Sequence, residues 1–140
     1  MTLRFALDTN VLAEPLKATP NAGVMRKLQK HDGQLCIPTP VWHEMWFGCL
    51  RLPSGKRRRV IAKYLVDVLQ PAVPLLPYSA EAAKWHAAQR ARLIKTGRTP
   101  TFVDGQIAAV AVEHKLTLVT ANLGDFKAYS DIKVVDWRSR

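Results

Sequence analysis

The chain has 140 residues, a length typical of one domain with a buried core, and we expect a single domain over residues 1–140. Apolar residues make up 48% of it, yet no uninterrupted apolar run reaches the roughly 18 residues of a membrane span, and no signal-peptide pattern opens the sequence. We therefore expect a cytoplasmic protein that neither spans a membrane nor is secreted. Cys36 and Cys49 lack CxxC spacing and are predicted to be reduced, buried thiols.

The charge balance is strongly basic. There are 21 Lys and Arg residues against 11 Asp and Glu residues, a formal net charge of +10. Such an excess favours a polyanionic partner, which means a nucleic acid, an acidic protein or an anionic membrane. A positive surface that is merely solvated is the alternative, and composition alone does not separate these interpretations.

The first fifty residues predict two strands and two helices, each with its own start signal. A Ser/Thr/Asn/Asp residue before an apolar stripe, with Pro next to it, is typical of a helix start. In chain order we expect a strand over residues 3–7 that ends at Asp8, a helix with Thr19 as N-cap and Pro20 in its first position that stops at residues 31–33, a strand over residues 34–37, and a helix with Thr39 as N-cap that runs to about Leu50.

The rest of the chain continues the alternation of helices and short strands. We expect a helix over residues 56–69, an edge strand or extended segment over 71–77, a helix over 80–96 capped by Ser79, a polar loop over 97–101, a helix over 104–113, and strands over 116–120 and 133–135. This alternation predicts an α/β fold with a parallel sheet that helices cover on both faces. In such sheets, functional sites lie at the carboxyl ends of the strands.

Several carboxylates stand beside apolar segments, where burial without a partner is costly. Asp8 follows a strand, Glu44 lies inside an apolar helix, and Asp104 opens another. Asn122 and Asp125 follow the strand over residues 116–120, so they are expected at the same sheet edge as Asp8. Each carboxylate also has a purely structural interpretation: Asp8 as a turn cap, Asp104 as a helix N-cap, Asp125 as a solvated loop residue, and Glu44 as an exposed residue on the outer edge of its helix.

The sequence does not indicate a histidine zinc site, a phosphate-binding loop or a serine nucleophile. The four histidines show no HxxxH or HExxH spacing, and the sequence has no GxGxxG, GxxxxGK[ST] or GxSxG motif. The remaining donors are carboxylate and amide oxygens, which suit a hard divalent cation such as Mg²⁺ or Mn²⁺.

Four segments, in this order, resemble the PIN domain family, and in particular the VapC-type ribonuclease toxins of type II toxin–antitoxin systems. They are LDTNV at residues 7–11, TPVWHE at 39–44, DGQIAA at 104–109 and TANLGDF at 120–126. The resemblance covers essentially the whole chain, and Glu14-Pro15-Leu16 is similar to the FitB-like branch.

The resemblance implies a three-layer α/β/α fold and an endoribonuclease that depends on Mg²⁺ or Mn²⁺. It implies that Asp8, Glu44 and Asp104 hold the metal, that Asn122 or Asp125 fills the fourth acidic position, and that the hydroxyl residues Thr9 and Thr120 orient the acidic residues. Asn122 would supply only a neutral oxygen. A VapB-type antitoxin and a homodimer are implied as partners, and in related pairs an antitoxin arginine can enter the acidic site.

The basic residues then have a plausible role along an RNA backbone or at an antitoxin contact. The candidates are Lys56, Arg57, Arg58, Arg59 and Arg98, together with Arg90, Arg92 and Lys95. A solvated helix face is the alternative for all of them. The four tryptophans are expected in the core or a dimer interface and not as base-stacking residues.

Three other functions are compatible with parts of this pattern. A housekeeping PIN nuclease would share the site, and a catalytically silent PIN-fold module would share the fold without holding metal. A response-regulator receiver is also an α/β domain with carboxylates at strand ends. The first strand here ends in one aspartate, however, no phosphoacceptor aspartate follows the second or third strand, and the chain is basic.

Overall fold

The structure is a computed structural model and describes residues 2–139. Its centre is a five-stranded parallel sheet in the order β3-β2-β1-β4-β5. The strands are β1 (Phe5–Leu7), β2 (Leu35–Pro38), β3 (Leu75–Leu76), β4 (Thr117–Val119) and β5 (Lys133–Val135). The predicted parallel sheet is therefore confirmed, and β1 lies at its middle with β2 and β4 on either side.

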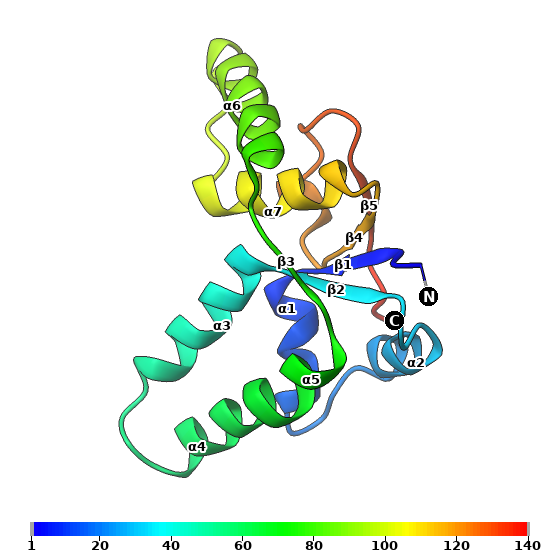
Figure 1. Ribbon diagram of the computed structural model, residues 1–140, viewed down its shortest axis with the longest axis vertical. Coiled ribbons are helices and arrows are strands. Elements are labelled where there is room, and N and C mark those ends of the chain that lie inside the picture. Colours follow the sequence, from blue (N-terminus) through cyan, green and yellow to red (C-terminus); the bar gives the residue numbers. More distant parts are fainter. Residues whose placement is uncertain (1, 140) are drawn as a thin grey trace.

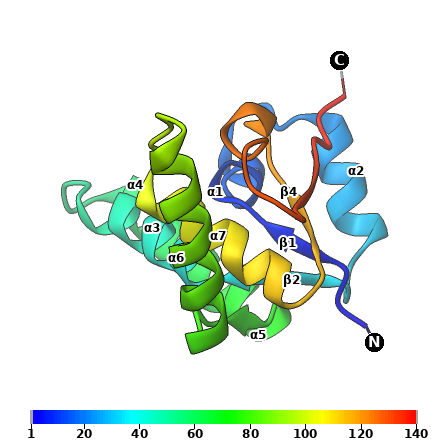
Figure 2. The same cartoon turned by 90° about the horizontal axis from the view of Figure 1, so that it is seen from above.

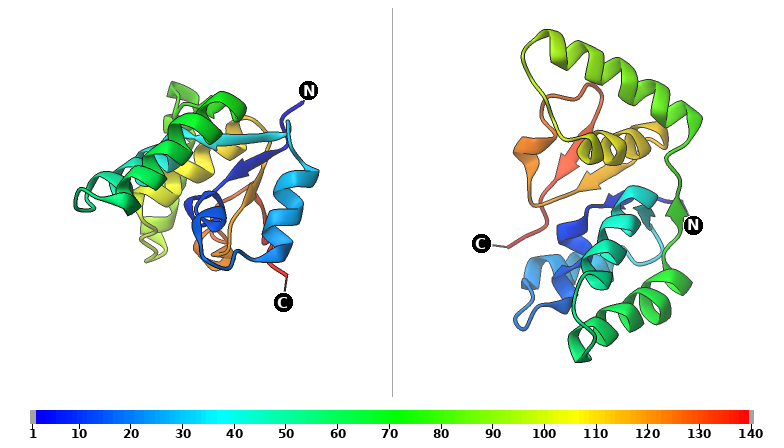
Figure 3. Two further views of the ribbon diagram at one scale, coloured as in Figure 1. Left: turned by 90° about the horizontal axis from the view of Figure 1, so that it is seen from below. Right: turned by 90° about the vertical axis from the view of Figure 1, so that its left-hand side faces the viewer.

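Helices form a layer on each face of this sheet. They are α1 (Thr9–Leu12), α2 (Ala22–Lys30), α3 (Thr39–Leu50), α4 (Lys56–Lys63), α5 (Gln70–Ala72), α6 (Ala80–Lys95) and α7 (Phe102–Glu113), with short 3₁₀ turns η1 (Glu14–Leu16) and η3 (Leu123–Asp125) and a π-helical segment η2 (Tyr64–Leu69). Figure 1 shows α6 and α7 on one side of the strands and α1 to α5 on the other. The right-hand view of Figure 3 shows the same three layers from the side, as the resemblance implied.

The central strands are apolar throughout because both of their faces are covered. Ala6, Ile37 and Leu118 are completely inaccessible to solvent. From above, α6 and α7 cross over the strands (Figure 2), while the left-hand view of Figure 3 shows the other helices from below. Cys36 and Cys49 are both buried and free, as predicted, and burial raises the pKa of Cys36 to about 12. Within residues 2–139, no helix is both long and apolar enough to span a bilayer.

The starts of α2, α3 and α7 differ from the prediction. The helix expected at Pro20 begins at Ala22, because the Asn21 carboxamide caps it by accepting from the amides of Gly23 and Val24. The same Asn21 oxygen also accepts from the amide of Ser139, so the segment at Ser139 is bound to this helix. The Asn21 side chain therefore both caps α2 and binds a segment far along the chain.

At α3 the predicted N-cap is also wrong. Thr39 is the first helical residue, Pro40 the second, and Pro38 precedes the helix without a side-chain cap. The Thr39 hydroxyl instead accepts from the amide of Tyr78, which links α3 to the segment before α6. The predicted end at Leu50 is confirmed.

The middle of the chain follows the predicted pattern with one change. The helix predicted over residues 56–69 is present as α4 followed by η2, but helical structure continues through Gln70–Ala72. Pro71 is the second residue of this last segment. Only Leu75–Leu76 of the segment predicted as extended forms an edge strand. The Ser79 cap of α6 is confirmed, because its hydroxyl accepts from the amide of Ala82.

Candidate functional site

Five of the predicted site residues line one open pocket at the carboxyl ends of β1 and β4: Asp8, Thr9, Glu44, Asp104 and Asn122. Asp8 follows β1, Asn122 follows β4, Glu44 comes from α3 and Asp104 from α7. We call this hollow of about 550 Å³ the acidic pocket; its lining consists of Asp8, Thr9, Asn10, Ala13, Glu44, Thr101, Val103, Asp104, Ile107 and Asn122. The parallel topology therefore brings together segments that are far apart in the sequence.

Asp8 is the most deeply buried of these carboxylates, with 6% of its surface exposed. Its Oδ1 accepts from the amide of Thr9 at 2.7 Å, so it caps the first turn of α1. Its Oδ2 accepts from the Thr120 hydroxyl at 2.8 Å and from the Asn10 carboxamide at 3.2 Å. Asp8 thus has the capping role of the structural interpretation, and it also lines the acidic pocket.

The polar residues around Asp8 form one connected network. Thr120 is fully buried, donates to Asp8, and accepts from the amide of Asn122 at 3.0 Å. The Asn10 Nδ2 lies 3.4 Å from the Thr120 oxygen, while its Oδ1 accepts from the amide of Ala121 at 2.9 Å. Thr9 contacts Asp8 through its backbone amide. Two strand ends are joined in this way around a single carboxylate.

Sequence reasoning missed Asn10. It stands two residues after Asp8 in the LDTNV segment. The structure shows a carboxamide that bonds to residues 110 and 111 positions away, Thr120 and Ala121. A usable signal existed, because a side chain with both a donor and an acceptor beside a buried carboxylate is suited to orienting it.

Asp104 is not the N-cap of its helix. The helix begins at Phe102, and Thr101 caps it by accepting from the Asp104 amide at 3.2 Å. The carboxylate therefore sits in the first turn, half-buried, where the helix dipole favours negative charge. The next residue, Gly105, lies directly against the His86 ring of α6, and a Cβ at this position would overlap that ring.

Glu44 reaches the pocket from the side of α3. Its side chain is 35% exposed, so the structure places it at the mouth of the pocket and not in its floor. Its Oε1 lies 3.6 Å from Nδ1 of His43. Glu44 is thus partly exposed, and it also faces the same hollow as Asp8 and Asp104.

The two candidates for the fourth position occupy different places. Asn122 lines the acidic pocket, whereas Asp125, at the end of η3, is exposed and is not part of the pocket lining. Asp125 nevertheless acts on the pocket through its charge, because it raises the pKa of both Asp8 and Asp104.

The electrostatics identify this edge as a centre of negative charge. Burial is the main cause that raises the pKa of Asp8, opposed by the hydrogen bonds from Thr120, Thr9 and Asn10. Burial also raises the pKa of Asp104, and the charges of Asp8 and Asp125 raise it further. The charge on Asp104 in turn adds to burial in raising the pKa of Tyr129 to about 12. Carboxylates that disfavour one another's charge in this way are suited to binding a cation.

The donors in the acidic pocket are all oxygens. Its lining contains three carboxylates, two carboxamides and two threonine hydroxyls, with no histidine or cysteine. This set matches the preference of Mg²⁺ and Mn²⁺. Over the part of the chain that the structure describes, no three His, Cys, Asp or Glu side chains are grouped closely enough to hold one ion directly. The pocket is therefore an open oxygen-lined hollow and not a compact coordination cage, an arrangement compatible with a cation that keeps several of its waters.

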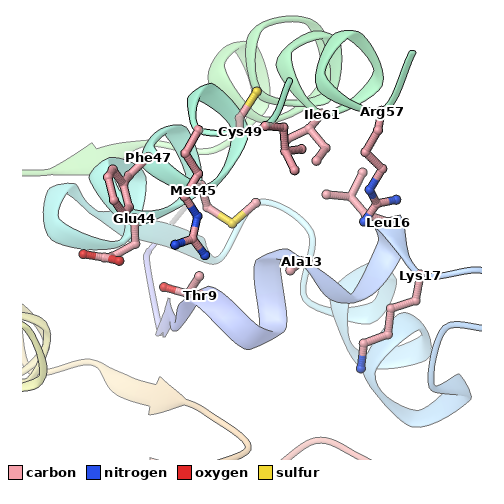
Figure 4. A pocket seen from close by; sticks show the side chains of 13 residues that line it. Thr9, Ala13, Leu16, Lys17, Glu44, Met45, Phe47, Cys49, Arg57 and Ile61 are labelled. Atoms are coloured by element: carbon pink, nitrogen blue, oxygen red, sulfur yellow. The ribbon is translucent and has the colours of Figure 1, made fainter. Parts of the chain in front are cut away.

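A second hollow adjoins the acidic pocket and shares Thr9, Ala13 and Glu44 with it. We call this hollow of about 620 Å³ the basic groove; it is lined by Thr9, Ala13, Leu16, Lys17, Glu44, Met45, Phe47, Gly48, Cys49, Arg51, Leu52, Arg57 and Ile61. Figure 4 shows Glu44 and Phe47 at one end of it and Lys17 and Arg57 at the other. Lys17 is paired with the buried Glu14 at 2.9 Å, whereas no ion pair of Arg57 with a carboxylate is found in residues 2–139.

Comparison with known proteins identifies the family. The PIN domain family matches residues 5–132. The chain belongs to the PIN domain family. This PIN domain is 34% identical over 133 residues to the toxin FitB of Neisseria gonorrhoeae, covering 91% of this chain and 94% of that protein. It is 31% identical over 125 residues to the VapC ribonuclease Y4jK of Sinorhizobium fredii, covering 87% and 89% of the two chains.

Solved structures agree with this assignment. A structure of FitAB bound to an IR36 DNA fragment matches with a TM-score of 0.85 at 30% identity, covering 97% of each chain. A DNA-bound VapBC from Salmonella typhimurium matches with a TM-score of 0.82 at 26% identity, covering 96% of this chain and 98% of that one. The α/β architecture of this PIN domain is therefore shared with toxin–antitoxin complexes over nearly its full length.

The predicted basic residues of this PIN domain are not equivalent. Arg57 lines the basic groove, while Lys56, Arg59 and Arg98 are exposed but line neither of the two hollows. Three others have contacts within the fold, that of Arg58 through its backbone, while Lys95 is exposed. The carbonyl of Arg58 accepts from the Cys49 thiol, the Arg90 guanidinium lies over the Phe102 ring, and Arg92 donates to Gln89 and to the carbonyl of Ala128.

Proposed function

We propose that this PIN domain is a metal-dependent endoribonuclease that acts as the toxin of a type II toxin–antitoxin pair. The observation that carries the proposal is the convergence of Asp8, Glu44 and Asp104 on one oxygen-lined pocket. The relatives support the reaction and the role, since they include a VapC ribonuclease and a FitB toxin. Cleavage of an RNA phosphodiester is hydrolysis, and cellular RNA as the substrate places the protein in the cytoplasm.

The metal in this proposal is Mg²⁺ or Mn²⁺. Asp8 and Asp104 would hold it, with Glu44 contacting it through water, and Asn122 or Asp125 completing the set. When bound, such a cation lowers the pKa of a water molecule and offsets negative charge at the phosphate during hydrolysis. The support is the donor chemistry of the acidic pocket and the mutual effect of its carboxylates on their pKa values.

The chain's own residues prepare the site in three ways. Thr120 and Asn10 donate to Oδ2 of Asp8 and the Thr9 amide donates to Oδ1, so this carboxylate keeps one orientation. The cap from Thr101 holds the first turn of α7, and with it the Asp104 side chain, at the pocket. The cations of the basic groove would bind phosphates next to the cleaved one, because an acidic pocket repels RNA on its own.

A protein antitoxin is the second partner in the proposal. The similar structures are FitAB and VapBC assemblies, which supports a VapB-type partner for this chain. A homodimer is also proposed from the family resemblance. The exposed apolar side chains Ile94 on α6 and Phe102 on α7 are available for such a contact.

The test is cleavage of total RNA by the purified protein in Mg²⁺, in Mn²⁺ and in EDTA. An Asp104→Asn variant prepared in the same way controls for a contaminating nuclease. We expect cleavage that requires metal and that is lost in the variant. Equal cleavage by both proteins would refute the assigned site, and RNA binding without cleavage in either metal would favour a catalytically silent module.

The toxin role is tested separately from the chemistry. A toxin arrests growth when it is produced alone, and co-production with its antitoxin restores growth. We expect growth arrest with the wild type and none with Asp104→Asn. A wild type that cleaves RNA but leaves growth unchanged would favour a housekeeping nuclease with the same site.

A further inference from the structure

Three planar side chains follow one another along the exposed edge of α3 and its C-cap. His43, Phe47 and Arg51 are spaced four residues apart, so they lie one above the other on the helix surface. The rings of His43 and Phe47 are nearly parallel, with an interplanar angle of 13° and centroids 6.3 Å apart. The guanidinium carbon of Arg51 lies 5.3 Å from the centre of the Phe47 ring. We call these three residues the planar strip.

The planar strip is open to solvent, unlike the other aromatic residues of the same helix. Phe47 is 52% exposed, and the His43 side chain is 74% exposed. Trp42 and Trp46, by contrast, are packed against the core. His43 and Arg51 both lie over the Phe47 ring, so what the strip offers a ligand is the exposed part of Phe47 together with the exposed His43 side chain beside it.

The position of the strip connects it to both hollows. Glu44 follows His43 in the sequence and lines the acidic pocket and the basic groove alike. Phe47 and Arg51 line the basic groove. Figure 4 shows Arg57 toward the opposite end of the groove from Phe47. A ligand that leaves the acidic pocket past Glu44 therefore meets the planar strip first and the positive charge of Arg57 farther along the groove.

We propose that the planar strip binds unpaired bases of the RNA next to the cleaved phosphate. Every base has a flat face that stacks on aromatic rings and on arginine planes, while its phosphates bind cations. The strip supplies the planes, and Arg51 and Arg57 supply the charge. Bases in a duplex are stacked on one another and are not available, so the substrate is single-stranded at this position. The identity of the polymer as RNA rests on the proposed function.

Binding is measured by fluorescence anisotropy in EDTA, with every variant made in the Asp104→Asn background so that no RNA is cut. The probes are a labelled single-stranded RNA, an RNA duplex of the same length, and an abasic ribose-phosphate strand with the same charge. Phe47→Ala is compared with Phe47→Trp, which keeps a plane, and Arg51→Lys keeps charge without one. Leu50→Ala is the matched control, because Leu50 is 54% exposed on the same helix but outside the strip.

We expect Phe47→Ala to weaken binding of the single strand about tenfold, the loss of one stacked base, and Phe47→Trp to retain it. Arg51→Lys should weaken binding in the same direction, and Leu50→Ala should leave it unchanged. The abasic strand should bind equally to Phe47→Ala and to its parent, because it has no base to stack. Thermal melting of each variant shows that an exposed substitution has not altered the fold.

Wild-type-like binding of the single strand by Phe47→Ala overturns the proposal and leaves this surface to a protein partner. An equal loss for the abasic strand also overturns it, since the effect would then not involve bases. The outcome is separate from that of the cleavage test. If Asp104→Asn abolishes RNA cleavage but Phe47→Ala does not weaken RNA binding, only the role of the planar strip is refuted. If Phe47→Ala weakens RNA binding but the wild type cleaves no RNA, only the nuclease activity is refuted.

Discussion

Asp8 has three hydrogen-bond donors around it, and one of them, Asn10, also binds the backbone that follows β4. Removing this carboxamide in Asn10→Ala leaves Thr120 to hold Oδ2 of Asp8 alone and frees the Ala121 amide. Residues that orient metal ligands typically change metal affinity or activity by about 10- to 100-fold when removed. We expect a loss of RNA cleavage in that range, with the Mg²⁺ concentration for half-maximal activity shifted upward.

The matched variant is Thr120→Val, which keeps the shape and removes the other donor to the same oxygen. Because Asn10 and Thr120 both hold the Asp8 carboxylate, the fold-loss of RNA cleavage in the double variant should be smaller than the product of the two single fold-losses. A purely structural role would lower the melting temperature without moving the Mg²⁺ dependence. Unchanged metal dependence in Asn10→Ala would therefore contradict the orienting role.

Asp104 is expected to lower the stability of the metal-free protein at neutral pH. Burial and the charges of Asp8 and Asp125 raise its pKa above the ordinary value of 3.8, and they outweigh the hydrogen bond of the Thr101 side chain, which lowers it. The folded state then holds its proton to a higher pH than the unfolded state. The contribution of Asp104 to the free energy of unfolding therefore decreases as the pH rises from 3.8 through the raised pKa of the folded state.

In EDTA at neutral pH, Asp104→Asn should melt a few degrees above the wild type, because the variant has no charge to bury. The difference should narrow as the pH falls toward 3.8, where the wild-type carboxyl is also protonated. Mg²⁺ should raise the melting temperature of the wild type more than that of the variant. A variant that melts below the wild type in EDTA at neutral pH would contradict this assignment.

At the scale of elements, the contact between α6 and α7 fixes where Asp104 stands. Gly105 follows it and is packed against the His86 ring, whose Nδ1 is 2.8 Å from the Tyr78 hydroxyl. Gly105→Ala forces the two helices apart, and overpacking of this kind costs about 1 to 3 kcal/mol. We expect a lower unfolding free energy in urea and, because α7 moves, reduced RNA cleavage.

Space restored on the opposite helix should reverse part of this effect. Gly105→Ala combined with His86→Ala should be more stable than the sum of the two single changes predicts. Gly48→Ala is the matched control, since no atom lies within 4 Å of a Cβ added there and helical alanine is favoured over glycine by about 1 kcal/mol. Destabilisation by Gly48→Ala equal to that of Gly105→Ala would show that the close contact with His86 is not the cause.

The elements also show what local sequence patterns determine. Short apolar segments and the Ser79 cap predicted the strands and α6 closely, because those signals act within a few residues. The starts of α2, α3 and α7 were displaced by one or two residues. At α2 and α3 the deciding contacts are tertiary: Asn21 binds Ser139, and Thr39 binds Tyr78. The π-helical segment Tyr64–Leu69 had no sequence signal that we recognised.

At the scale of the whole molecule, topology explains why the site was predictable in outline. Parallel strands end at one edge, so the positions of Asp8 and Asn122 followed from the strand assignment alone. The inclusion of Glu44 and Asp104 depended on the family resemblance and on their unusual apolar surroundings. Asn10 and the basic groove were not foreseen, because both arise from contacts between segments that no local pattern connects.

The net charge of +10 acts on RNA as a general field, and Arg57 is predicted to act as a specific contact within it. Each phosphate contact to a single strand contributes about 0.7 to the slope of log affinity against log salt concentration. Arg57→Gln should therefore reduce that slope by about 0.7 and weaken binding at low salt. The measurement is anisotropy of single-stranded RNA at several salt concentrations, in EDTA and in the Asp104→Asn background.

Lys30→Gln is the matched control, because it removes one positive charge at a distance from the site. Lys30 ends α2 just before β2 begins, so it lies at the amino-terminal edge of the sheet, whereas the acidic pocket and the basic groove lie toward the carboxyl-terminal edge. Its removal should leave the slope unchanged and lower the affinity slightly, through the general field. An equal change in slope for both variants would mean that RNA responds to the overall charge and does not follow the basic groove into the acidic pocket.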